Sequence, residues 1–92
     1  MIAVLTIELR IEGAHSLKDK RQVVRGLKDR IRERIAAAVA EVDHQDLWQR
    51  AALGVAVVAA DGGQARELLQ SVRGLVERTY EAQLTDWQER LE

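Results

Sequence analysis

The chain has 92 residues, of which 47% are hydrophobic and 32% are charged, and its formal net charge is -1. This length and composition predict one folded domain and exclude a disordered tail. Because the sequence has no cysteine, disulfides, thiolate metal sites and cysteine nucleophiles are excluded.

The amino-terminal segment MIAVLTIELRI has neither a basic leader nor a small-residue cleavage site, so it is unlike a signal peptide. In the same segment, apolar residues alternate with Thr6, Glu8 and Arg10, which predicts a half-buried strand. The longest apolar run covers residues 51–60, whereas a membrane-spanning helix needs about 20 residues. We therefore expect a cytoplasmic protein with no membrane partner.

A helix is predicted over residues 17–34, after a connection at residues 12–15. Its apolar residues recur at helical spacing, at Leu17, Val24, Leu27, Ile31 and Ile35. Ser16 precedes this helix as a predicted N-cap, and Asp19 three residues later gives a short version of the capping box.

In residues 37–43, apolar and polar side chains alternate again, which predicts a strand. The apolar, β-branched run in residues 49–60 predicts another strand, which pairs with strand 37–43 as a hairpin. Asp61-Gly62-Gly63 predicts a turn, and helical spacing of apolar residues predicts a helix over residues 64–79. In the last segment, residues 82–91, the local pattern slightly favours a helix. A strand would complete the architecture, and a strand is our prediction.

The predicted order is β-α-β-β-α-β, the split βαβ or ferredoxin-like arrangement of the α+β class. It occupies residues 1–92 as a single domain. We expect a four-stranded antiparallel sheet with both helices on one face and the other face open.

Basic side chains are concentrated in residues 16–35, where eight bases accompany three acids in a chain that is otherwise acidic. On a helical projection, five of them fall within an arc of about 80° beside the apolar positions. We interpret this flank and the helix start as a site for phosphates of RNA or a nucleotide. The candidate residues are Ser16, Lys18, Lys20, Arg21, Arg25, Lys28 and Arg32. The alternative is a solvated flank with ion pairs and with long side chains over the core edge.

A second polar cluster lies around the predicted hairpin turn. Its members are Glu41, Asp43, Asp46, Trp48 and Arg50, together with His44. Metal binding or acid–base chemistry is disfavoured, because Asp43 and His44 are expected on opposite faces and the only other histidine is His15. We expect a polar loop with Trp48 at the core edge, with no catalytic residue, metal or cofactor. Glu41 is expected to pair with a base of the preceding helix.

The predicted third strand has small apolar residues on the face away from the helices. These residues are Ala52, Gly54, Ala56 and Val58. We expect this surface to form a homo-oligomer or partner contact. The alternative is the ordinary apolar share of a protein surface.

Known motifs of related topology do not fit. The predicted central strands lack the stacking aromatics of an RNA-recognition motif, and the chain has no G-x-x-G loop of a KH domain. Gly62 and Gly63 do not form a Walker loop, and there is no G-x-S-x-G nucleophile motif.

Two blocks, SLKDKRQVVRGLKDRIRER and VAEVDHQDLWQRAALGVAVV, resemble the YlxP-like family of small bacterial proteins of uncharacterised function. The resemblance covers most of residues 1–80. The characteristic positions correspond to Ser16, Leu17, Lys18, Lys20, Arg21, Glu41, Asp46, Trp48, Gln49 and Arg50. The resemblance implies a ferredoxin-like fold with a terminal strand. It also implies a genomic setting beside initiation factor two and ribosome-binding factor A, hence a role near the small ribosomal subunit.

The leading functional prediction is a protein that binds small-subunit ribosomal RNA or ribosome-maturation proteins through the basic flank. The alternative is a homodimeric interaction module built on the open sheet face. The least favoured reading is a small enzyme or nucleotide binder that uses Ser16 and Glu41.

Overall fold

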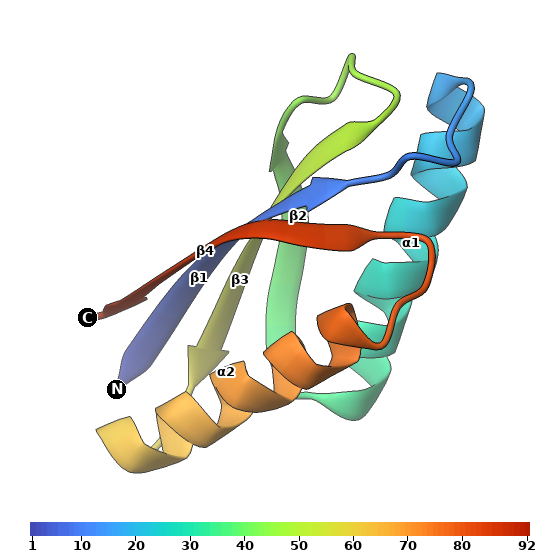
Figure 1. The fold of residues 1–92 in the computed structure, drawn as a ribbon. Helices are drawn as coiled ribbons and strands as arrows, with labels where there is room; N and C mark the ends of the chain where they lie inside the picture. The colour runs from blue at the N-terminus through green and yellow to red at the C-terminus, as the bar shows by residue number, and fades with distance from the viewer.

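The periodicity of the sequence appears as six elements in the predicted order, in a computed structural model that describes all residues from Met1 to Glu92 (Figure 1). The elements are β1 (Ile2–Arg10), α1 (Leu17–Arg34), β2 (Ala37–Asp43), β3 (Arg50–Val58), α2 (Gly62–Glu77) and β4 (Gln83–Leu91). The strand predicted for the last segment is confirmed as β4.

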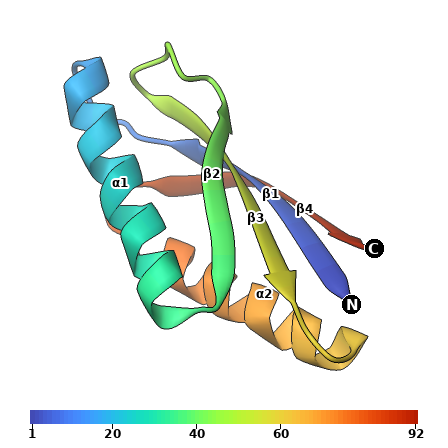
Figure 2. The ribbon, with the colours of Figure 1, turned by 180° about the vertical axis from the view of Figure 1, so that it is seen from behind.

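The sheet has the strand order β2-β3-β1-β4, and every neighbouring pair is antiparallel. β1 and β3 are therefore the central strands. Both helices cover one face of the sheet, and the opposite face carries no helix (Figures 1 and 2). The ferredoxin-like arrangement predicted from the sequence is confirmed.

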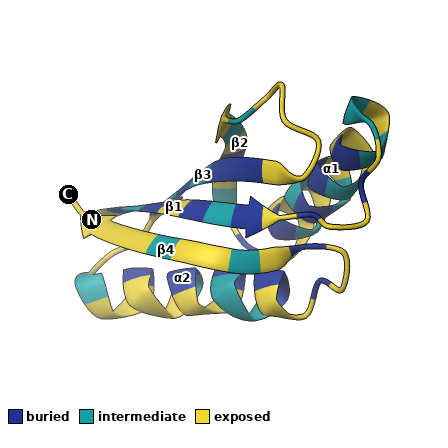
Figure 3. Cartoon of the chain, turned by 45° about the horizontal axis from the view of Figure 1, so that its top comes forward, coloured by how far each residue is buried: buried dark blue, intermediate teal, exposed yellow.

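The hydrophobic core lies between the sheet and the two helices. Alternate residues of β1 and β3 enter it and meet the apolar stripes of α1 and α2. Figure 3 shows the buried residues on the central strands and on the inner sides of the helices, whereas β4 is mostly exposed. Neither helix is both long enough and apolar enough to span a lipid bilayer.

Both helices begin at a side-chain cap. The Ser16 hydroxyl accepts the Asp19 N–H at 3.0 Å, as predicted. The turn predicted at residues 61–63 is wrong, because Asp61 is the N-cap of α2 and accepts the Gln64 N–H at 2.8 Å. A carboxylate at this position satisfies a free N–H and suits the helix dipole, which offsets the low helix propensity of Gly62 and Gly63.

A β-bulge explains why the sequence of β4 also fits a helical period. Glu8 pairs with Asp86 and Leu9 pairs with Leu84, so Thr85 is an extra residue in β4. The extra residue shifts the alternation and brings Leu84 and Trp87 onto the same, core-facing side. Trp87 packs against the core there. A spacing of three residues, typical of a helix, is therefore produced by a bulged strand.

Candidate functional site

Lys20 is completely buried, although it lies in the first turn of a basic helix. Its Nζ lies 2.9 Å from Glu41 Oε2 and 2.7 Å from the carbonyl oxygen of His44. It also donates to the carbonyl oxygens of Gln45 and Arg50, at 3.2 and 3.4 Å. The predicted pairing of Glu41 with a base of this helix is confirmed. The assignment of Lys20 to the anion-binding set is wrong, because its ammonium group faces the protein interior.

These contacts fix the segment between β2 and β3, residues 44–49, to α1. His44 has a φ of 62°, a left-handed conformation that turns the chain sharply after β2. The Asp43 carboxylate accepts the His44 N–H at 2.7 Å, and the His44 ring lies 3.1 Å from Glu8 Oε2. The expectation that Asp43 and His44 extend to opposite faces is therefore wrong, since His44 is not in an extended conformation.

The predicted polar cluster is divided among several partners. Glu41 forms an ion pair with Lys20, and Arg50 lies 3.7 Å from Glu8. The side chains of Asp43 and Asp46 are exposed. No group of three histidine or carboxylate side chains converges in a way that could hold a metal ion. The hypothesis of a small enzyme or nucleotide binder depended on Ser16 and Glu41. Both side chains are engaged within the protein, because Ser16 caps α1 and Glu41 is paired with Lys20.

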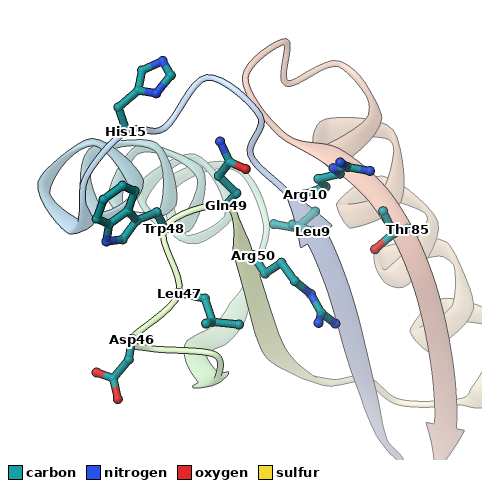
Figure 4. A pocket seen from close by; sticks show the side chains of 9 residues that line it. All are labelled: Leu9, Arg10, His15, Asp46, Leu47, Trp48, Gln49, Arg50 and Thr85. Carbon is teal, nitrogen blue, oxygen red and sulfur yellow. The ribbon is translucent and has the colours of Figure 1, made fainter.

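A cavity of about 860 Å³ opens beside the fixed segment, at the end of the central strands (Figure 4). Its walls come from four parts of the chain. They are Leu9 and Arg10 of β1, His15 before α1, residues 46–50, and Thr85 of β4. Thr85 is the bulge residue of β4, so the irregular pairing of that strand lies at this cavity.

Two arginines line this cavity from neighbouring positions of the sheet. Arg10 and Arg50 are direct partners in the β1–β3 register, so both side chains leave the open face at the same level. Like charges directly opposite each other in a sheet repel. Two carboxylates compensate them in part: exposed Glu12 lies 3.4 Å from Arg10, and half-buried Glu8 lies 3.7 Å from Arg50. An anion bound at the cavity would relieve the remaining repulsion.

Trp48 and Gln49 add an aromatic surface and a hydrogen-bond acceptor. The Trp48 residue is 54% exposed, so its predicted packing at the core edge is wrong. Gln49 Nε2 donates to the carbonyl oxygens of Glu12 and Ala14, at 3.0 and 3.1 Å. The Gln49 amide oxygen accepts no hydrogen bond within the protein, and Figure 4 shows it on the side of the cavity.

In Figure 2, α1 runs beside β2, and Arg32 reaches the Val39 carbonyl oxygen of that strand. The other bases of the predicted set lie on the same flank of α1 as Arg32, at spacings of three and four residues. We call Lys18, Arg21, Arg25 and Lys28 the basic stripe; none of them forms an ion pair. Arg32 continues the stripe, but it donates to the Val39 carbonyl oxygen at 2.8 Å and lies 3.9 Å from Asp29. The structure thus separates the free bases from Ser16, Lys20 and Arg32, which have partners within the protein.

Sequence reasoning missed a second group of bases on the opposite flank of α1. Arg30 and Arg34 line a hollow of about 210 Å³ together with Arg78 at the end of α2. The spacing of four residues between Arg30 and Arg34 predicts that they are neighbours on α1. No pattern in the sequence near Arg78 indicates that it lies beside them. Arg10, His15 and Gln49 were likewise missed as a group, because they lie on three separate segments.

The proposed apolar surface of β3 is smaller than the sequence predicts. Ala52 is buried, and the side chain of its β1 partner Glu8 lies 3.1 Å from the His44 ring. Gly54 and Ala56 are half-buried, and a Cβ atom on Gly54 would lie 3.0 Å from Val42 Cγ1. Only Val58 is widely exposed, at 73%.

Comparison with known proteins gives a consistent picture. Residues 2–89 match the family model described as "Protein of unknown function (DUF503)". The chain is 32% identical over 85 residues to the "Uncharacterized protein YlxP" of Bacillus subtilis (strain 168), which covers 92% of each chain. The structure is similar to that of a de novo designed protein with a ferredoxin fold, LFR1 1. The alignment covers all of this chain and 87% of the designed chain, with a TM-score of 0.58 at 15% sequence identity. The designed protein shows the fold alone.

Proposed function

This chain belongs to the DUF503 family, as its resemblance to the YlxP-like proteins predicted, and we propose that it binds RNA through the phosphate backbone. The contact would be made by the basic stripe, Lys18, Arg21, Arg25 and Lys28. The observation that carries the proposal is that these four neighbouring bases have no acidic partner in a chain of net charge -1.

The separation of charge on α1 supports this proposal. Arg21, Arg25 and Lys28 are neighbours at spacings of three and four residues, where like charges destabilise a helix. Asp29 borders the stripe, but its ionic contact is with Arg32 at 3.9 Å, and Glu33 forms no ion pair with the four bases. Phosphates would supply the missing negative charge and release their own counterions. The genomic setting implied by the family resemblance makes small-subunit ribosomal RNA the first RNA to examine.

Changing Arg21 and Arg25 together to Gln is expected to weaken RNA binding and to reduce its dependence on salt. For single-stranded nucleic acid, each neutralised phosphate contributes a slope of about -0.7 to the logarithm of affinity against the logarithm of salt. Two lost contacts should therefore flatten the slope by about 1.4. Fluorescence anisotropy with a labelled small-subunit RNA fragment, over a series of KCl concentrations, measures both quantities.

A charge-matched control is available elsewhere on the chain. Arg66 of α2 is exposed and without an ion pair, and Arg90 of β4 contacts only Glu92 at the sheet edge. The Arg66→Gln and Arg90→Gln double variant has the same net charge as the test variant. Equal loss of affinity in both double variants would mean that only total charge matters, and the stripe would be rejected as the site.

A homodimer through the open sheet face is the second candidate function. Val58 and its β1 partner Ile2 are exposed neighbours on this face, and Val42 is exposed beside Gly54. Contact between two such faces would remove these apolar side chains from water. Gly54 and Ala56 would lie at the flat centre of this contact. Ala52 would not take part in it, because it is buried.

The dimer is tested by Val58→Glu, which places a charge on the most exposed apolar position of β3 while leaving the core intact. We expect wild type to sediment as a dimer at micromolar concentration and the variant to sediment as a monomer. Sedimentation velocity measures this directly. A monomeric wild type, or a dimeric variant, would exclude an interface at this position.

A further inference from the structure

We propose that the cavity beside Trp48 is a stacking site for one unpaired nucleobase. The inference rests on the proposed RNA binding and specifies the kind of RNA, a single-stranded segment with at least one accessible base. It adds a recognition element at the end of the central strands, separate from the basic stripe on α1 (Figure 4).

The indole of Trp48 is the first argument. The other tryptophan, Trp87, packs against the core, donates to Glu89 and lies under the Arg73 guanidinium, 4.9 Å from its ring centroid. Trp48 has no such partner and is more than half exposed beside the cavity. It does not lie on a loose loop, because buried Lys20 holds the backbone on both sides of it at Gln45 and Arg50. A fixed, exposed aromatic side chain is a suitable platform for a base.

Polar groups around the cavity complement the edge of a base and its phosphate. The Gln49 amide is oriented by its two backbone contacts, and its oxygen is left to accept from an amino or imino group. Arg10 and Arg50 both line the cavity, and each guanidinium group can bind base oxygen and nitrogen acceptors or a phosphate. A nucleotide has all the required parts, namely a π-face, donors, acceptors and an anionic group. The cavity, about 860 Å³, is large enough for a base with its ribose.

The cavity also lies close along the chain to the start of the basic stripe. His15 lines the cavity and is followed directly by the cap of α1, and Lys18 stands in the first turn. A strand whose base stacks on Trp48 can therefore continue along α1, with its phosphates toward Lys18 and Arg21. This continuity favours single-stranded RNA over a peptide, since a peptide would leave the cationic stripe without a partner.

The test uses Trp48 as its own probe. In a Trp87→Phe background, which keeps an aromatic ring beneath Arg73, Trp48 is the only indole. The protein is titrated with an oligoribonucleotide of about ten nucleotides, a length in the range of single-stranded sites. A ribose-phosphate chain of equal length without bases is the control ligand. We expect base-dependent quenching of Trp48 fluorescence with the oligoribonucleotide and none with the control.

A second measurement compares affinities by anisotropy. Trp48→Leu retains apolar volume but removes the π-face, and we expect affinity to fall roughly 5- to 150-fold while the melting temperature is unchanged. Trp48→Phe should restore part of the loss. RNA binding that needs Arg21 and Arg25 but neither quenches Trp48 nor weakens in Trp48→Leu would overturn this inference and leave the proposed function standing. Absence of RNA binding by wild type would overturn both and leave the cavity to a protein partner.

Discussion

Replacing Lys20 with Met is expected to lower the free energy of unfolding by about 3 kcal/mol, the lower part of the range for breaking a buried ion pair. The change leaves the Glu41 carboxylate without its ionic partner and removes the ammonium donor from the carbonyl oxygens of His44, Gln45 and Arg50. For a domain of this size, each kcal/mol corresponds to about 4–8 °C in melting temperature. The expected decrease is therefore about 12–24 °C, measured by calorimetry or circular dichroism.

Lys18→Met is the matched control, since Lys18 lies in the same turn of α1 but is exposed and unpaired. Its effect on the free energy of unfolding should stay within about 0.5 kcal/mol. The two variants should also separate the two proposed contacts with RNA. Lys18→Met removes a charge of the stripe, whereas Lys20→Met releases residues 44–49 and disturbs the cavity around Trp48. Similar stability of Lys20→Met and wild type would contradict the structural role given to Lys20.

Leu27→Ala is expected to lower the free energy of unfolding by about 3–4 kcal/mol. Leu27 is completely buried in the central cluster of the core, together with Val24 and Ile31 of the same helix. Truncation removes its apolar contacts and leaves a cavity beneath α1. Urea denaturation gives the change directly, and an unchanged slope would show that the unfolded state is not altered.

Leu91→Ala provides the comparison for Leu27→Ala, because the same atoms are removed from the exposed edge strand β4. Its cost should be below about 1 kcal/mol, since a partly exposed side chain loses little burial and leaves no closed cavity. Equal costs at the two positions would contradict the location of the core between α1 and the sheet.

The elements and their order could be predicted because they depend on local patterns. Alternation gave β1, helical spacing gave α1, and the Ser16 hydroxyl marked the start of that helix. The resemblance in two blocks correctly indicated the family. The last strand was harder, because the bulge at Thr85 places Leu84 and Trp87 on one face at a spacing that also fits a helix. A bulge depends on pairing with another strand, so it leaves no clear signal in a single segment.

The sequence by itself determined which residues carry charge and which face of α1 they occupy. Only the tertiary structure decided that Lys20 is an interior group, because its acceptors at His44, Gln45 and Arg50 come from a segment more than twenty residues away. The composition of the cavity wall also depends on the tertiary structure. The antiparallel register pairs Arg10 with Arg50, and the fixed loop leaves Trp48 exposed beside them. Charge and periodicity are properties of residues along the chain, whereas burial and convergence depend on which distant backbone groups the fold brings within hydrogen-bonding distance.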